Sequence, residues 1–209
     1  MSEINDWIDV VLGINKRFIE ITKDIAKKYN LEFKSFNPEI YGEEEVFQRV
    51  KALYKDEYIR KIRETWVDII YTKKEDEIII KIDRNYFTRR KIYKLSEKTL
   101  QKMEEKFIKI VEEKIANFAR DCKEESIIRT KIYNLLDSKV GLKPNELDRI
   151  GEEFIACFNR ENEKDERVEL IVKGKANTDS IKITKIEIYD KKGQRLPYFL
   201  EQIFQIFNN

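Results

Sequence analysis

The sequence predicts an α+β protein with a mainly helical body, one β-hairpin and a small β-containing unit after it. Three observations predict this fold class. Apolar residues recur at helical spacing through most of residues 1–158, they alternate with polar residues at 67–83, and alternation returns in residues 167–209. Residues 159–166 are charged and lack apolar anchors, so we interpret them as a linker between the two parts.

Two long helices are expected first. Residues 4–29 carry one wide apolar face at helical spacing. Residues 43–66 begin with Glu43–Glu45, whose charge suits the positive end of a helix. The apolar positions of this second helix would be Val46, Val50, Leu53, Tyr54, Ile62 and Trp66.

A change of period then predicts the hairpin over residues 67–83, with a four-residue connection at Lys73–Asp76. Ser96 has the position of an N-cap for a helix that reaches Cys122. A shorter helix over 126–138 and another over 144–158 complete the predicted helical body.

The last part of the chain alternates again. Val168–Val172 predicts a strand, and the slip of phase between Ile183 and Ile186 indicates a β-bulge or two short strands. Asp190–Gly193 predicts a turn, and Pro197–Phe207 predicts a final aromatic-rich helix.

The amino-acid composition excludes several common kinds of catalytic and binding site. The chain has no histidine and six glycines, so the most common general base and metal ligand is missing and no phosphate-binding glycine loop occurs. This favours a binding or scaffold role over catalysis, with no small-molecule substrate. The charged fraction of 39%, rich in Lys and Glu, predicts a thermophilic and archaeal source, with an AT-rich genome as the alternative cause of the high lysine content. Without a signal peptide or a long apolar stretch, we expect a cytoplasmic protein that does not bind membranes.

One basic stretch predicts a nucleic-acid contact. The net charge of the whole chain is only +2, so a polyanion would have to bind to a local patch. Cations interleaved with rings suit a nucleic-acid backbone and unstacked bases, although the same pattern also fits a solvated loop. The candidate residues are Arg84, Tyr86, Arg89, Arg90, Lys91, Tyr93, Lys94 and Lys98.

Carboxylates also allow the alternative of a divergent Mg²⁺-dependent nuclease. Such a site needs two acids that hold the metal ion and a lysine that orients water. Asp68 with Lys81 is one candidate set, but Ile79 occupies the intervening acid position. The other set is Asp179 and Asp190 with Lys192, where turn chemistry is the competing interpretation.

A further stretch resembles a known family. Gln48–Tyr54, followed by Lys61-Ile62-Arg63 and Trp66, is similar to a long helix of the GINS family of replisome subunits, and Leu95-Ser96-Glu97 is similar to the opening of a later helix. The resemblance implies a helical domain joined to a small β-rich domain, and a non-catalytic subunit that packs against other subunits. The implied interface residues are Arg49, Tyr54, Lys61, Arg63 and Trp66.

The leading hypothesis is therefore a non-catalytic assembly subunit of a DNA-replication or related nucleic-acid-processing complex. Its partners would be protein subunits, in a hetero-oligomer or a homo-oligomer, with DNA as a further partner and no cofactor. The alternatives are the Mg²⁺-dependent nuclease and an archaeal viral or plasmid DNA-binding protein that uses Arg84–Lys98.

Overall fold

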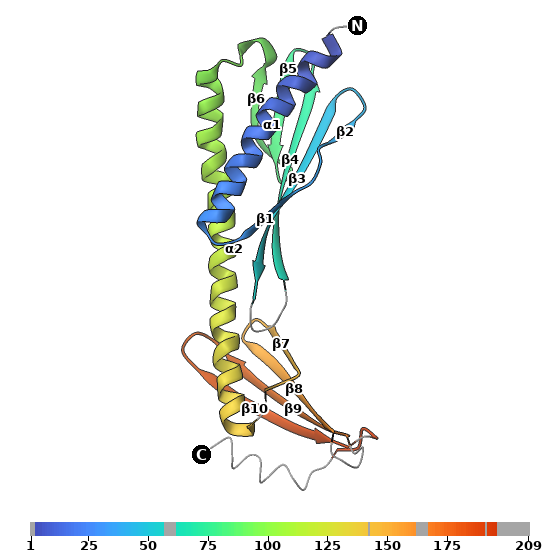
Figure 1. Ribbon diagram of the computed structural model, residues 1–209, viewed down its shortest axis with the longest axis vertical. Helices are drawn as coiled ribbons and strands as arrows, with labels where there is room; N and C mark the ends of the chain where they lie inside the picture. The colour runs from blue at the N-terminus through green and yellow to red at the C-terminus, as the bar shows by residue number, and fades with distance from the viewer. Residues whose placement is uncertain (1–2, 57–61, 142, 162–166, 191, 196–209) are drawn as a thin grey trace. The chain divides into compact units, whose positions relative to one another are not determined.

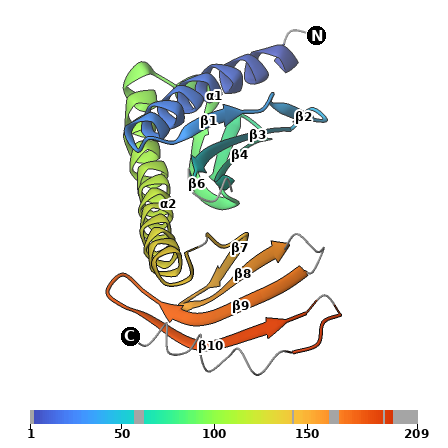
Figure 2. The ribbon, with the colours of Figure 1, turned by 60° about the horizontal axis from the view of Figure 1, so that its bottom comes forward.

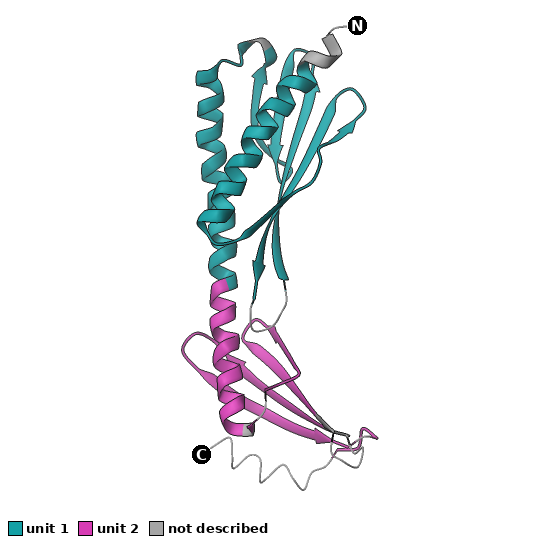
Figure 3. Cartoon of the chain, viewed as in Figure 1, with its two compact units in different colours: residues 1–122 teal, residues 123–209 magenta. Residues whose placement is uncertain are grey.

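The fold is taken from a computed structural model, which describes residues 3–56, 62–141, 143–161, 167–190 and 192–195. The chain divides into two compact units, residues 1–122 and 123–209, which Figure 3 shows in different colours. Each unit is described by itself.

Unit 1 is an antiparallel sheet, sheet A, with helices on one face. The strand order is β1-β3-β4-β5-β6, and β2 also pairs with β3. Figure 1 shows α1 crossing this sheet. The elements are α1 (Glu3–Lys28), β1 (Glu32–Ser35), β2 (Glu39–Tyr41), β3 (Glu45–Lys55), β4 (Ile62–Lys74), β5 (Glu77–Ile82), β6 (Asn85–Lys91), the 3₁₀-helix η1 (Ile92–Lys94) and the first part of α2 (Glu97–Val140).

The core of unit 1 lies between the two helices and one face of sheet A. Phe18 of α1 stacks on Phe107 of α2, with 4.0 Å between ring centroids. Phe87 of β6 meets both rings edge-on, at 6.0 and 6.3 Å. This aromatic contact joins both helices to the sheet and leaves the opposite face of sheet A uncovered by α1 and α2.

Unit 2 repeats the arrangement of a helix on an antiparallel sheet. Its sheet B has the order β10-β9-β8-β7, and Figure 2 shows these four strands side by side. The last part of α2 supplies Ile128, Ile132 and Leu136 to the core of this unit. The strands are β7 (Glu146–Ile150), β8 (Glu153–Glu161), β9 (Arg167–Ala176) and β10 (Ile181–Tyr189).

The predicted mainly helical body is wrong, because the described residues form two antiparallel sheets and two α-helices. The predicted helix over 43–66 is the strand pair β3 and β4. Along β3 the inward side chains are Val46, Gln48, Val50 and Ala52, all buried. A polar and a small residue among them hide the period of two and leave a spacing of four that imitates a helix.

The predicted helix over 144–158 is also wrong, since these residues belong to β7 and β8. Gly151, at φ 60°, turns the chain between the two strands. Phe154 points inward and is buried, whereas Ile150 and Ile155 are exposed on the other face. The predicted short helix over 126–138 is the continuation of α2. The unit boundary at 122/123 falls inside α2, and β8 extends to Glu161 where the linker was expected.

Other expectations are confirmed. The first helix is α1, and Ser96 Oγ accepts a hydrogen bond from Thr99 N at 3.3 Å as an N-cap of α2. The hairpin is β4 and β5, but its connection is the two residues Glu75 and Asp76 and not the predicted four, because Lys73 and Lys74 still pair with β5. The bulge lies between Ile183 and Lys185, and Asp190 Oδ1 accepts from the Lys192 and Gln194 amides, at 2.8 Å each, in the predicted turn. The predicted helix over 197–207 lies outside the described residues.

A candidate binding face on the first sheet

The face of sheet A opposite α1 and α2 gathers aromatic and charged side chains from adjacent strands. We call it the outer face of sheet A. The register places Arg49 of β3 opposite Asp68 of β4, and Lys51 opposite Trp66. The same face continues across β4, β5 and β6. Ile70 and Lys81 alternate with the buried residues of their strands, and Tyr86, Arg89 and Lys91 of β6 pair with outward-facing residues of β5.

An aromatic cluster lies at one end of this face. It consists of Phe36, Phe47 and Trp66 with the cations Arg49 and Lys51. The Phe36 and Trp66 rings stack with centroids 5.9 Å apart and planes 25° apart. Lys51 Nζ lies 4.6 Å from the Trp66 ring centroid and 5.8 Å from that of Phe36. The Arg49 guanidinium lies 5.0 Å from Trp66 and 5.3 Å from Phe47, so each cation bridges two rings.

A small depression opens inside this cluster. It measures about 180 Å³, and its walls are the rings of Phe36, Phe47 and Trp66 together with Arg49. The side chains of Asn37 and Glu39 also line it. The depression therefore combines flat apolar walls with hydrogen-bonding groups, and its size suits one planar ring system such as a nucleobase.

The position of Arg49 is fixed by a fork of two hydrogen bonds. Its Nε and Nη2 atoms donate to the two carboxylate oxygens of Asp68, both at 2.7 Å. Such bidentate pairs hold the guanidinium plane in one orientation. The bonded carboxylate also raises the pKa of Arg49, so the cation over Trp66 is permanent.

A buried polar network on the helix-covered side of sheet A fixes the backbone of Phe36. Tyr71 donates through its hydroxyl to Asn15 Oδ1 at 3.1 Å, and Asn15 Nδ2 donates to Gln48 Oε1 at 2.9 Å. Gln48 Nε2 then donates to the backbone oxygens of Phe36 and Arg49, at 2.8 and 2.9 Å. The network thus links α1 and the sheet interior to the backbone on which the aromatic cluster is mounted. Burial raises the pKa of Tyr71 well above its usual value, which keeps its hydroxyl a donor.

The residues of the predicted basic stretch do not share one surface. Some lie on the outer face of sheet A, Arg90 lies on the opposite face, and others follow β6 in η1 and α2. Tyr86, 67% exposed, and Arg89 lie on the outer face, where Arg89 pairs with Glu77. Lys91 shares that face and lies 3.4 Å from Asp76. Arg90 points to the other face and donates to the Arg89 carbonyl at 2.9 Å. Lys94 lies in η1 and Lys98 in the first turn of α2, and the side chain of Tyr93 is outside the described part of the chain.

A second, more open depression adjoins Trp66, with a volume of about 460 Å³. Arg84 and Asp83 line it from the turn between β5 and β6, and Lys114 lines it from α2 and pairs with Asp83. Asp83 and Arg84 both have positive φ, 51° and 68°, as in a two-residue type I′ hairpin turn. Arginine is unfavourable in that conformation, so the turn holds a cation beside Trp66 at some cost in stability.

Of the two predicted nuclease sets, the structure places Asp68 and Lys81 on one face as diagonal neighbours and separates Asp179 from Asp190. Asp68 bonds Arg49 at both oxygens, and Lys81 lies diagonally from it across β4 and β5. Asp179 and Asp190 lie at opposite ends of β10, about 30 Å apart for a nine-residue strand. Among the residues that the structure describes, no three His, Cys, Asp or Glu side chains converge as metal ligands.

The predicted interface residues also separate. Arg49 and Trp66 lie together in the aromatic cluster, whereas Tyr54 packs against the core of unit 1. Arg63 donates to the Asp121 carbonyl at 3.5 Å, and Lys61 lies outside the described residues. Sequence reasoning missed Phe36, Phe47 and Lys51. The signal for the last two was their strand phase with Arg49, which the helical interpretation obscured.

Comparisons with known proteins found no family model, no curated protein and no solved structure that matches the chain. Within the described residues, no helix combines the length and apolar character that a bilayer span requires. The candidate function therefore depends on the geometry of the outer face of sheet A.

Proposed function

We propose that this protein is a nucleic-acid-binding subunit that holds a single strand on the outer face of sheet A. The observation that carries the proposal is the aromatic cluster, in which Phe36, Phe47 and Trp66 flank a base-sized depression on a sheet face that the helices leave open. Antiparallel sheets that bind single strands use such rings to stack unpaired bases.

The charges support the same mode of binding. Lys34 lies 5.4 Å from the Phe36 ring centroid, and Arg84 lines the depression on the other side of Trp66. Lys81 lies on β5 of the same face, opposite Ile70 of β4 and Tyr86 of β6. Cations spaced along the rings can contact phosphates while the bases stack, and a duplex would not offer its bases to a flat face.

Fluorescence anisotropy with labelled oligonucleotides tests the proposal. The protein should bind single strands more tightly than duplexes of the same sequence. Trp66→Ala should weaken binding by about 1–3 kcal/mol, the range for loss of one base–aromatic stack. Tyr189→Ala removes a ring from sheet B and serves as the matched control, with unchanged binding expected. Equal affinity of the Trp66→Ala protein and the native chain would refute the proposal.

Intrinsic fluorescence provides an independent measurement. The chain has two tryptophans, and Trp7 is buried in the core of unit 1 with 1% exposure. A stacked base should quench the emission of Trp66 alone. Trp66→Phe should therefore abolish the quenching while it keeps most of the affinity, because a phenyl ring can still stack.

Salt dependence tests the contribution of the cations. Removal of one phosphate contact should reduce the slope of log K against log salt by about 0.7 for a single strand. We expect this for Lys81→Ala and for Arg84→Ala. Lys27→Ala removes an exposed lysine from α1, on the helical side, and should leave the slope unchanged.

A second candidate is the predicted assembly subunit of a replication or related complex. The specific observation in its favour is charge balance, since Arg49 pairs with Asp68, Lys51 with Glu64 and Arg89 with Glu77. Trp and Arg within a neutral patch are typical of protein interfaces. Absence of single-strand binding, together with a protein captured from the host by the native chain and not by Trp66→Ala, would favour this candidate.

A further inference from the structure

Sheet B also has a face that α2 does not cover, and charges of opposite sign are separated across it. We call it the outer face of sheet B. One cross-strand row runs Asp148–Ile155–Lys173–Lys185, and the next runs Ile150–Glu153–Lys175–Lys182. In both rows the acidic residue lies on β7 or β8, and the lysines lie on β9 and β10.

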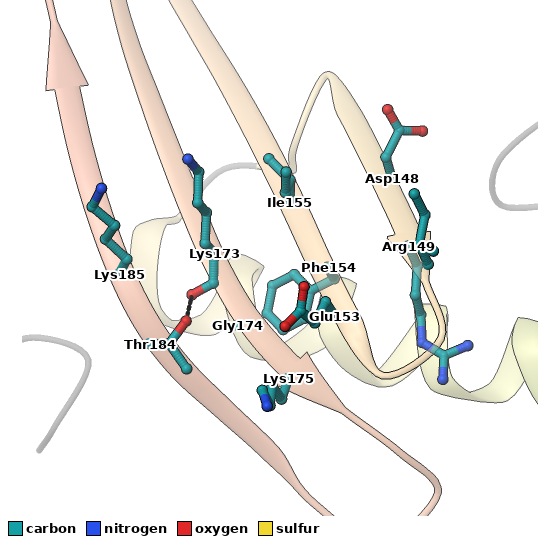
Figure 4. A pocket seen from close by; sticks show the side chains of 11 residues that line it. Asp148, Arg149, Glu153, Phe154, Ile155, Lys173, Gly174, Lys175, Thr184 and Lys185 are labelled. Atoms are coloured by element: carbon teal, nitrogen blue, oxygen red, sulfur yellow. Dashed lines mark hydrogen bonds between the residues drawn. The ribbon is translucent and has the colours of Figure 1, made fainter.

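Figure 4 shows the first row from this side, with Asp148, Ile155, Lys173 and Lys185 on four neighbouring strands. These side chains line a shallow depression of about 270 Å³. The other face of the sheet is packed, because Phe154 lies against Gly174 so closely that a Cβ at residue 174 would approach the ring to 2.5 Å. The row and the depression therefore belong to the uncovered face.

The lysine half of the face is held in place by one carboxylate. Glu187 of β10 accepts from Lys185 at 2.9 Å and from Lys173 at 3.0 Å, and these bonds lower its pKa to about 2. Lys175 and Lys182 extend the positive half and are exposed. The positive charge of this half thus exceeds what Glu187 neutralises.

Apolar side chains occupy the middle and one end of the face. Ile155 is 44% exposed, and Ile150 is 86% exposed. Cys157 and Ile171, which are partly exposed cross-strand neighbours, continue the apolar strip along β8 and β9. Apolar groups between two oppositely charged margins are the pattern of an interface with a polar rim.

We propose that two copies of this chain associate through the outer face of sheet B. A two-fold axis that runs parallel to the strands, between β8 and β9, places the acidic half of each copy on the lysine half of the other. In the first row Asp148 then faces the partner's Lys185. In the second row Glu153 faces the partner's Lys175. Next to the first row along β8 and β9, Cys157 faces the partner's Ile171, and the Ile155 side chain lies beside this apolar contact. One self-complementary patch on both subunits is what a two-fold dimer requires.

The charge pattern also distinguishes a second copy from the other available occupant, residues 196–209 of the same chain. That segment is apolar and its only charged side chain is Glu201, so it cannot match an acidic half and a basic half together. The four strands give a footprint on the order of 500 Å², from strand length and strand spacing. This is at the small end for protein interfaces, so we expect a weak, salt-sensitive dimer.

A charge exchange between two residues tests the geometry. Glu153→Lys and Lys175→Glu each place like charges opposite one another in a homodimer, so each variant alone should dimerise at least about tenfold more weakly. Mixed in equal amounts, the two variants should form a heterodimer, because both interchain contacts become complementary. Analytical ultracentrifugation with one variant fluorescently labelled measures this directly.

The mixture of the two variants distinguishes repulsion between chains from repulsion within one chain. Glu153 and Lys175 are cross-strand neighbours within one chain, and mixing does not repair like charges there. Recovery on mixing therefore supports the proposed axis, and failure to recover overturns it. Glu152→Lys makes the same charge change in the adjacent turn and should leave the dimer intact.

A truncation after Arg195 tests the competing occupant. The native chain should dimerise in the micromolar to submillimolar range, and the truncated chain should dimerise equally well. A native chain that stays monomeric, or a dimer that forms only after truncation, would overturn the proposal. The measurement uses unit 2, so it stands apart from nucleic-acid binding by sheet A, and Ile155→Arg should abolish the dimer without a change in oligonucleotide affinity.

Discussion

The buried network beneath the aromatic cluster yields a stability prediction that can be worked out bond by bond. Gln48 is fully buried and makes three hydrogen bonds, one accepted from Asn15 and two donated to the Phe36 and Arg49 carbonyls. Replacement by leucine, of similar volume, removes all three. The Arg49 carbonyl keeps a bond from the Phe36 amide at 3.1 Å. Asn15 Nδ2 and the Phe36 carbonyl lose the partners they have here.

We expect Gln48→Leu to lower the free energy of unfolding by about 2–3 kcal/mol. Each buried group left without a partner costs about 1–3 kcal/mol, and the greater apolarity of leucine offsets part of the sum. The Phe36 carbonyl is only partly buried, so water can recover some of its loss. Urea unfolding followed by circular dichroism measures the change, with an unaltered m-value as the check that the transition is the same.

A matched triple variant makes the reasoning refutable. Gln48→Leu, Asn15→Leu and Tyr71→Phe together replace all three side chains of the network by apolar groups, so only the partly buried Phe36 carbonyl still loses its partner. Replacement of both partners of a buried bond is nearly neutral where the removal of one partner is not. The triple variant should therefore lie within about 1 kcal/mol of the native chain, if leucine fits the site of Asn15. A neutral single variant, or a triple variant worse than the single one, would show that these bonds do not contribute as argued.

Three further predictions concern single residues. Glu187→Gln should make the free energy of unfolding depend less on pH between about 4.5 and 2. The pKa of Glu187 is about 2 in the folded chain against a usual 4.5, so the stability that its carboxylate contributes is present above pH 4.5 and is lost as the pH falls toward 2. Gly174→Ala should destabilise unit 2 by about 1–3 kcal/mol in thermal unfolding, because the added Cβ meets the Phe154 ring and a backbone carbonyl at 2.5 Å. Arg84→Gly should keep or raise stability, within about 1 kcal/mol, because glycine accepts the positive φ, while it weakens single-strand binding in the anisotropy assay.

The fold could be predicted from the sequence where the apolar residues of an element keep one regular spacing, as in the helix α1, the hairpin of β4 and β5 and the two phases of β10. The N-cap at Ser96 could be predicted from a hydroxyl residue directly before such a segment. Prediction failed for β3, where buried Gln48 breaks the alternation. It failed again for β7 and β8, whose exposed isoleucines add apolar residues to the wrong face.

The candidate site was predicted in fragments. Trp66 and Arg49 were singled out as interface residues and Arg84–Lys98 as a nucleic-acid contact, on segments thought to be a helix and a loop. Strand pairing brings members of both groups to one face and adds Phe36, Phe47 and Lys51 to them. No local pattern marks Phe36, because its place depends on a hydrogen bond to Gln48 twelve residues away.

The sequence by itself determined the balance of charge, the absence of histidine, the local periods of its most regular segments and the supply of aromatic and basic residues. These properties belong to single residues or to neighbours along the chain. Only the tertiary structure decided which of those residues share a face, because cross-strand register joins positions far apart in sequence and buried polar partners are recognisable only when both are in place.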